Sequence, residues 1–128
     1  MESLYRTENI DISYDPEKGI LHCKWKGKQS EEGIKKIGAV ILKITRERKI
    51  VKILNDNTAV VGSWQDAADW ASREWFPDMI NAGLRYFAWI LPTNIFAELS
   101  AKLAMSGAED VVVTFQDYET AYRWLVSK

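Results

Sequence analysis

The residues of this chain best suited to catalysis are its single histidine and its single cysteine, His22 and Cys23, which are neighbours. A cysteine activated by a nearby histidine base is a common catalytic nucleophile. Both residues lie in a stretch that alternates apolar and polar positions as a β-strand does, and neighbouring side chains of a strand point to opposite faces. The alternation predicts that Cys23 fills space in the core and that His22 is solvated, so the two do not form a nucleophile–base pair.

Metal and phosphate binding have no motif in the sequence. With one histidine and one cysteine, only carboxylates remain as metal ligands in any number. Asp66 and Asp69 are three residues apart on a predicted helix, but the same side carries Gln65 and Arg73, which is typical of a hydrated surface. The chain contains neither a Gly-x-Gly-x-x-Gly sequence nor a Walker-type Gly-Lys-Ser/Thr sequence. We therefore predict no catalytic residue, no metal and no cofactor.

Polar side chains follow a short β-branched run at residues 50–54. They are Asn55, Asp56, Asn57, Thr58 and Ser63. In parallel α/β sheets, ligands and partners bind beyond the carboxyl ends of the strands, so these residues are predicted to form part of a partner or ligand surface. The alternative is that they satisfy backbone groups of a turn and that Ser63 caps a helix. A phosphate near the helix amides would be stabilised, which makes Ser63 and Thr58 candidate phosphoacceptors.

Tryptophan is the most unusual feature of the composition, with six in 128 residues. Two lie in predicted strands, and Trp64 and Trp75 share an alanine-rich stripe of a predicted helix, so these four are predicted to be core residues. Trp70 lies about 120° from Trp64 on the same helix, and Trp124 lies off the centre of its own helix. Two interpretations of Trp70 and Trp124 stay open: they line a groove or an oligomer contact, or they cover the rim of the core.

The elements that position these residues begin with a β-hairpin. Apolar and polar residues alternate on both sides of Pro16–Gly19, a turn sequence, which predicts two antiparallel strands with one buried face. Ser30 and the two glutamates after it then predict a helix start. The helix has one apolar side and ends among basic residues. Its apolar side comprises Ile34, Ile37, Gly38, Ile41, Ile44 and Thr45.

The rest of the chain alternates strands with helices. Strands are predicted at residues 50–54, 84–91 and 111–115, and the second helix begins at Ser63. Pro77 is expected to kink or end that helix, because proline lacks an amide proton and clashes with the preceding turn. Asp117 is predicted to cap the last helix.

The third helix is predicted to be capped by Thr93 or Asn94 and to end near Gly107. Its large apolar residues recur at helical spacing, which predicts that they point into the core. They are Ile95, Phe96, Leu99 and Leu103.

The predicted order of elements is β-β-α-β-α-β-α-β-α, an α/β fold. Helices between apolar strands imply right-handed crossovers and a mostly parallel sheet with the helices packed on it. We predict a five-stranded sheet whose edge is the antiparallel N-terminal hairpin.

Several segments together give the chain a resemblance to a known family. They are the strand-end run Asn55–Asn57, the tryptophans of Trp70-x4-Trp75 with Phe76 and Pro77, the Ala82–Leu84 run that enters a strand, and the closing segment Phe115–Leu125. With the order of elements, they resemble the STAS fold of the anti-sigma-factor antagonists. More narrowly, the chain is similar to small bacterial proteins classed between STAS and the lipid-binding CRAL-TRIO domains.

The resemblance implies a non-enzymatic interaction module. Some STAS domains are switched by phosphorylation of a serine or threonine at the start of the helix after the third strand. The Asp-Ser-Ser/Thr-Gly motif of that switch is absent from this sequence. The corresponding region runs from Asn55 through Thr58 to Ser63.

The composition, 47% apolar and 27% charged, fits one compact domain, which we expect to span residues 1–128. Residues 1–64 carry 12 basic and 9 acidic side chains, and residues 65–128 carry 5 and 9. This asymmetry is too mild for a nucleic-acid-binding protein. No apolar stretch approaches the roughly 20 residues of a membrane span. The polar N-terminus lacks the apolar block of a secretory signal, and with the single cysteine it predicts a cytoplasmic protein.

Two functional hypotheses follow. The first is a non-enzymatic, STAS-like regulatory module that binds another protein or itself, as a homodimer, through the strand-end loops and the second helix. The second is a carrier or sensor of an apolar, lipid-like ligand, held in an aromatic-lined pocket near Trp70, Trp75 and Phe76. A carrier needs a cavity of roughly 300 Å³ or more.

Overall fold

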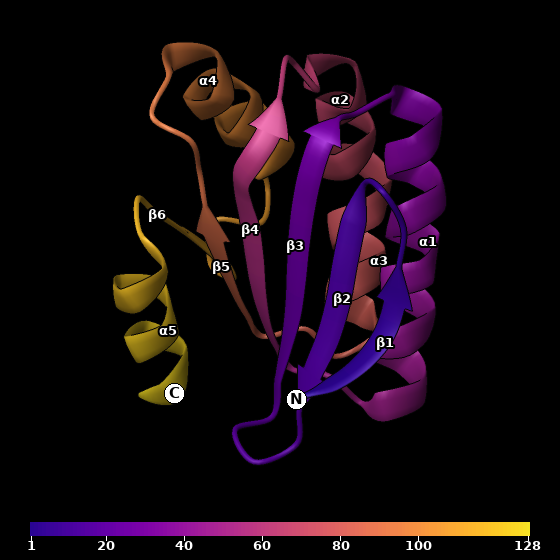
Figure 1. Ribbon diagram of the computed structural model, residues 1–128, viewed down its shortest axis with the longest axis vertical. Helices are drawn as coiled ribbons and strands as arrows, with labels where there is room; N and C mark the ends of the chain where they lie inside the picture. The colour runs from indigo at the N-terminus through magenta and orange to yellow at the C-terminus, as the bar shows by residue number, and fades with distance from the viewer.

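The computed structural model of the chain describes residues 1–128, and a six-stranded sheet with the order β1-β2-β3-β4-β5-β6 forms its middle layer (Figure 1). The strands are β1 (Glu2–Arg6), β2 (Ile10–Asp15), β3 (Ile20–Lys28), β4 (Lys52–Val61), β5 (Tyr86–Ile90) and β6 (Val112–Phe115). The first three pair antiparallel, and β3 to β6 are parallel. The predicted α/β fold with an antiparallel N-terminal edge is confirmed.

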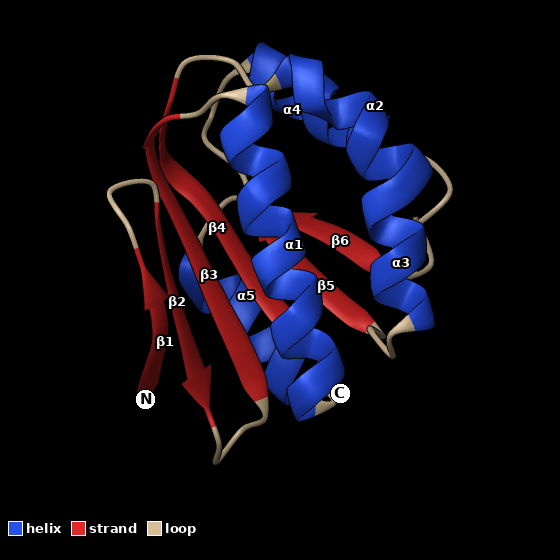
Figure 2. Ribbon diagram, turned by 90° about the vertical axis from the view of Figure 1, so that its right-hand side faces the viewer, coloured by secondary structure: helices blue, strands red, loops and turns tan.

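The helices cover the two faces of the sheet unequally. They are α1 (Glu31–Arg48), α2 (Ala68–Trp70), α3 (Phe76–Asn81), α4 (Ile95–Ala104) and α5 (Tyr118–Val126). Parallel strands that are neighbours in sequence, joined by crossovers of one hand, place the connecting helices on one face. Accordingly α1 to α4 lie on one side of the sheet, and α5 alone packs on the other (Figure 2). None of the helices combines the length and hydropathy needed to cross a membrane.

The sheet has one strand more than predicted, because β1 adds an antiparallel edge beside β2. Glu2 is opposite Tyr14 and Arg6 is opposite Asp11, but the register shifts between Ser3 and Tyr5. Such a bulge adds a residue to one strand and interrupts the period-2 alternation of side chains. Residues 2–6 therefore lack a clean strand pattern, and β1 is not predictable from the alternation of side chains.

Strand β4 is also longer than predicted. The sequence predicts that the strand ends before Asn55, whereas β4 continues to Val61. Asn55 lies between Cys23 of β3 and Trp89 of β5 in the sheet, and it is buried. A polar residue is tolerated in a central strand when its side chain is hydrogen-bonded. The expected loop over residues 55–63 is therefore wrong: only its last two residues lie outside the strand.

The segment between β4 and β5 is one helical path with changing winding. A short 3-10 turn, η1 (Gln65–Ala67), leads into α2, a π turn, η2 (Ala71–Trp75), follows, and α3 completes it. In η2 the Phe76 amide donates to the Ala71 carbonyl, five residues earlier. In this wider turn the carbonyl groups lie farther from the ring of Pro77, which would clash with the preceding turn of a regular α-helix. Of the two predicted outcomes, a kink or an end, the helix does not end at Pro77, and its irregular turn lies just before the proline.

Helix α4 turns its large apolar residues outward. Its buried residues are Ala97, Ser100, Ala101 and Ala104. Ile95, Phe96, Leu99 and Leu103 are 64%, 70%, 58% and 45% exposed. The prediction that these four point into the core is wrong. The helix lies against α2, and small side chains let the two backbones approach closely.

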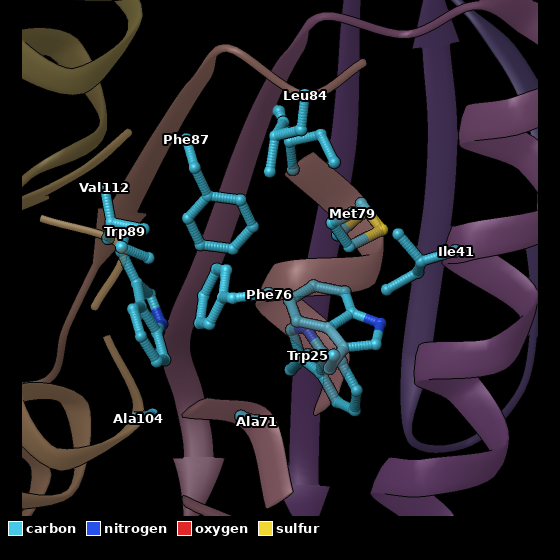
Figure 3. Close-up of a cluster of buried hydrophobic side chains, with 14 of the residues drawn as sticks. Trp25, Ile41, Ala71, Phe76, Met79, Leu84, Phe87, Trp89, Ala104 and Val112 are labelled. Atoms are coloured by element: carbon cyan, nitrogen blue, oxygen red, sulfur yellow. The ribbon is translucent and has the colours of Figure 1, made fainter. Parts of the chain in front are cut away.

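The main hydrophobic core lies between the sheet and the α1–α4 layer. Figure 3 shows part of it, with Phe76 of α3 beside Phe87 and Trp89 of β5. A smaller cluster of buried residues fills the space under α5. It comprises Ile20, Leu54, Ala88, Ile90, Ala121 and Leu125.

Candidate functional site

A pocket in the α1–α3 side of the sheet is walled mainly by aromatic rings, and we call it the aromatic pocket. Its cavity volume is about 60 Å³. The aromatic walls are Trp25, Trp64, Trp70, Trp75, Phe76, Phe87 and Trp89. The polar side chains in the lining are Gln29, Asn55 and Asn57. No lysine, arginine, aspartate or glutamate lines it.

The rings of the aromatic pocket pack against one another in fixed geometry. Trp64 and Trp89 have ring centroids 5.3 Å apart, and Trp75 meets Phe76 edge to face at 5.0 Å. Edge-to-face and offset contacts at these distances are favourable arrangements of aromatic side chains. Trp70 stacks on Trp75 at 6.4 Å. Trp70 is half-buried, and it is part of the rim of the pocket.

Gly38 of α1 lets two tryptophans lie against the helix backbone. A Cβ atom at this position would lie 2.7 Å from Trp70 Cη2 and 3.1 Å from Trp75 Nε1, closer than van der Waals contact permits. The Trp75 Nε1–H donates to the Gly38 carbonyl over 2.8 Å. The glycine therefore fixes how closely the helical segment 65–81 approaches α1.

A hydrogen-bonded relay of three side chains lies in the lining. The Trp25 Nε1–H donates to Asn55 Oδ1 over 2.8 Å, and Asn55 Nδ2 donates to Asn57 Oδ1 over 3.2 Å. Asn55 and Asn57 are two residues apart on β4, so their side chains share a face of the sheet. The Nε1–H of Trp89, on the neighbouring strand, is buried and has no hydrogen-bond partner.

The structure brings together five of the residues that the sequence singles out. Asn55, Asn57, Trp70, Trp75 and Phe76 all line the aromatic pocket.

The other four are elsewhere. Asp56 accepts from the backbone amide and the hydroxyl of Thr58, at 2.9 and 2.7 Å. Ser63 is exposed and accepts from the Gln65 amide over 3.2 Å. It is followed by Trp64 and the 3-10 turn η1, which is the first turn of the helical segment 65–81. Trp124 lies on α5, on the other side of the sheet.

The sequence pattern predicts Trp25, Trp64 and Trp89 as core residues without assigning them to a site, and it does not indicate Gln29 or the role of Gly38. One signal was available. Ile53 of β4 is fully buried in the main core, and the residues two and four positions later share its face. Extending that strand by alternation would have placed Asn55 and Asn57 inward beside the tryptophans.

His22 and Cys23 point to opposite faces, as predicted. Cys23 is part of the main core, and burial raises the pKa of its thiol. His22 stacks against Tyr118 and Tyr122 of α5, with ring centroids 6.2 and 6.5 Å away. Its Nε2 is buried without a partner, and burial lowers the pKa of the ring. The prediction of a solvated His22 is wrong, because the two tyrosines cover it.

No group of three or more histidine, cysteine, aspartate or glutamate side chains lies close enough together to hold a metal ion. The polar side chains that meet in the aromatic pocket are neutral amides and an indole, which are poor metal ligands.

Comparison with known proteins bears on the fold. No family model matches the chain, and no curated protein matches it. A solved structure does: an uncharacterised protein of the DUF3478 family with a SpoIIAA-like fold, from Shewanella loihica PV-4. The two chains are 19% identical over 98% of each, with a TM-score of 0.56. The chain therefore has a SpoIIAA-like fold, the STAS-like fold of anti-sigma-factor antagonists, and the resemblance found in the sequence is confirmed at this level.

Proposed function

We propose that the protein is a non-enzymatic regulatory module that associates with a second copy of itself through an apolar surface on α4. This surface, the α4 apolar face, consists of Ile95, Phe96, Leu99 and Leu103. The observation that supports the proposal is the orientation of the helix, which buries alanines and exposes its large side chains. A soluble chain gains free energy when such a face is covered.

The area of the α4 apolar face fits a weak, reversible dimer. With roughly 200 Å² for a large apolar side chain, the exposed fractions amount to about 500 Å². That is near the upper end for the largest apolar patch of an ordinary monomer. Two such faces together would bury about 1,000 Å², the lower limit for a specific interface.

The charges beside the face favour a second copy as the occupant. Glu98 and Lys102 are exposed on α4 and form no ion pair with each other, whereas four other pairs at this spacing do. If two α4 helices pack antiparallel on a two-fold axis near position 100, Glu98 of each copy lies opposite Lys102 of the other. An anionic membrane would instead favour a basic rim, and residues 65–128 carry 5 basic and 9 acidic side chains.

Sedimentation equilibrium at roughly 2 to 200 μM tests the proposal, because an interface of this size is expected to dissociate in the micromolar range. Leu99→Glu should leave the protein monomeric. Val61→Glu, at another exposed apolar residue, is the matched control and should dimerise normally.

Charge exchange then tests the geometry. Glu98→Lys and Lys102→Glu should each weaken the dimer by about two- to thirtyfold, because the two-fold axis places two such exposed ion pairs in the interface, and the double variant should restore it. A chain that stays monomeric at the highest concentration contradicts the proposal. So does a monomer that binds vesicles containing anionic lipid through the α4 apolar face.

A second candidate function is the binding of a small ligand in the aromatic pocket, which its walls of aromatic rings favour. Its cavity of about 60 Å³ is well short of the roughly 300 Å³ that a lipid-like ligand needs. We therefore restrict this candidate to ligands with a single ring or a few heavy atoms. Toluene is a suitable probe: at millimolar concentration it should shift the NMR signals of the Trp64 and Trp89 indole N–H groups. The signal of Trp124, on the other side of the sheet, should stay in place.

A further inference from the structure

The hydrogen-bonded relay in the aromatic pocket has a fixed direction. An indole N–H can only donate, so the atom of Asn55 that faces Trp25 must be the amide oxygen. The amide nitrogen of Asn55 is then the donor to Asn57, which must accept through its own oxygen. The amide nitrogen of Asn57 is therefore the free end of the relay, and turning any one amide over would break a hydrogen bond.

The free end of the relay is a donor without a partner in the protein. Asn57 is only 6% exposed, lines the aromatic pocket, and its Nδ2 donates to no group of the protein. The Nε1–H of Trp89 is a second unpartnered donor, on a side chain 5% exposed in the same lining. Buried donors are nearly always hydrogen-bonded, so the buried Trp89 N–H without a partner, beside the free amide of Asn57 in the same lining, indicates an acceptor that enters from outside.

The lining also sets the charge and shape of that acceptor. It contains no cationic side chain to stabilise an anion and no carboxylate to stabilise a cation. An aromatic cage alone attracts quaternary ammonium groups, but the two N–H donors would repel a cation. Indole and phenyl walls favour a flat ligand, which stacks on them or meets them edge to face.

From these features we infer that the aromatic pocket binds a small, flat, uncharged molecule whose carbonyl oxygen or ring nitrogen accepts a hydrogen bond from Asn57 Nδ2, with the Trp89 Nε1–H as a second donor. This inference rests on the second proposed function, ligand binding in the pocket. A cavity of about 60 Å³ is smaller than the roughly 150 Å³ that encloses benzene. The ligand therefore stays partly exposed at the rim, which half-buried Ile34, Val60 and Trp70 form.

The test compares four probes that each contain one ring. Benzamide is neutral and has a carbonyl acceptor, toluene is neutral and has none, benzoate is an anion, and benzyltrimethylammonium is a cation. Binding is followed by the NMR signals of the six indole N–H groups, with dissociation constants for such small probes expected in about the millimolar range. Benzamide should move the Trp89 signal downfield, as a new hydrogen bond does, and toluene should not. Benzoate and the ammonium probe should bind at least about tenfold more weakly than benzamide. Each would lose hydration of its charge on entering the pocket, and the uncharged lining offers no opposite charge in return.

Variants assign the contact to its donor. Asn57→Leu keeps the size of the side chain and removes the donor, so it should weaken benzamide at least about tenfold relative to toluene. Asn81→Leu, at an exposed asparagine of α3, is the control and should change neither. Trp89→Phe keeps a ring and removes the second N–H, and it serves if Asn57→Leu does not fold. Like Asn57→Leu, Trp89→Phe should lower the preference for benzamide over toluene.

The outcomes separate the inference from the function on which it rests. An unchanged ratio of benzamide to toluene affinity in both variants overturns the donor assignment while ligand binding stands. Tighter binding of the ammonium probe than of benzamide overturns it as well. If neither toluene nor benzamide moves any pocket signal, both the inference and ligand binding in the aromatic pocket are wrong.

Discussion

Helices α1 and α4 show how similar sequence patterns lead to opposite packing. Both carry large apolar residues at helical spacing, and both begin at a side-chain cap, Ser30 and Asn94. In α1 the large residues are inside, with Ile37 and Ile41 buried, whereas α4 buries alanines and leaves its large residues in solvent. A helix with an apolar stripe and an alanine stripe has two faces that could be buried. The distance to its neighbours then decides between them.

The largest expected effect is on the stability of the α1 side. Ile41 is fully buried, so Ile41→Ala removes well-packed methylene groups and leaves a cavity. We expect it to lower the free energy of unfolding by about 2–5 kcal/mol. Urea unfolding followed by tryptophan fluorescence measures the loss. A change below about 1 kcal/mol would mean that α1 packs more loosely than the structure has it.

A smaller loss is expected when the alanine stripe of α4 is enlarged. Ala101 is 1% exposed, and Ala101→Leu forces extra volume between α4 and the core. Overpacking of this kind lowers the free energy of unfolding by about 1–3 kcal/mol. The same unfolding experiment applies, with Lys102→Leu on the exposed side as the control. A stabilised Ala101→Leu variant would show that the helix is rotated from its position here.

Helix α5 packs on the other face of the sheet and covers His22, so the pH dependence of stability tests its packing. Because burial lowers the pKa of His22 below its ordinary 6.5, the unfolded chain takes up a proton before the folded chain does as the pH falls. Stability from this residue is therefore full above about pH 7 and declines as the pH falls through 6.5 to the lower folded pKa. His22→Gln should flatten the dependence of unfolding free energy on pH between 7.5 and 5.

That pH window isolates the only histidine. Asp11 and Asp117 have pKa values lowered below 3.8, held down mainly by hydrogen bonds from Lys26 and from the Thr120 backbone respectively, so they titrate at more acidic pH. An unchanged slope in His22→Gln would show that Tyr118 and Tyr122 do not shield the ring.

The smallest effect on stability is expected on the α4 apolar face. Leu99→Ala is the same kind of truncation as Ile41→Ala, but Leu99 is 58% exposed. Measured at a concentration where the chain is monomeric, it should change the free energy of unfolding by no more than about 0.5 kcal/mol. If it costs as much as Ile41→Ala, the orientation of α4 predicted from the sequence is right and the structure is wrong there.

Local signals were enough to predict most of the fold. The Ser30 and Asp117 caps accept from the amides three residues later, as their sequence context predicts. Elements whose form depends on distant residues were not predictable. Asn55 continues a strand because its amide bonds to Trp25, thirty residues away, and β1 is hidden by its bulge. The face of α4 depends on how closely α2 approaches it, which periodicity does not report.

The candidate site was predictable as a list of residues but not as an arrangement. Trp70, Trp75 and Phe76 are close in sequence, and their shared pocket follows from one helical segment. Asn55 and Asn57 join them only because β4 runs on under that segment, and Asp56 between them faces away. Alternation along a strand can separate such neighbours, but only once the strand is recognised.

The π turn η2 has a consequence for how related chains should be aligned. Residues five apart in a regular α-helix lie about 140° apart around the axis, whereas one π turn brings them nearly into line. Trp70 and Trp75 therefore share the wall of the aromatic pocket because the turn between them holds one residue more than an α-helix needs. A relative that lacks one residue there would have the two aromatic positions four apart, again on one face. A single-residue gap between these tryptophans is thus compatible with an unchanged pocket wall.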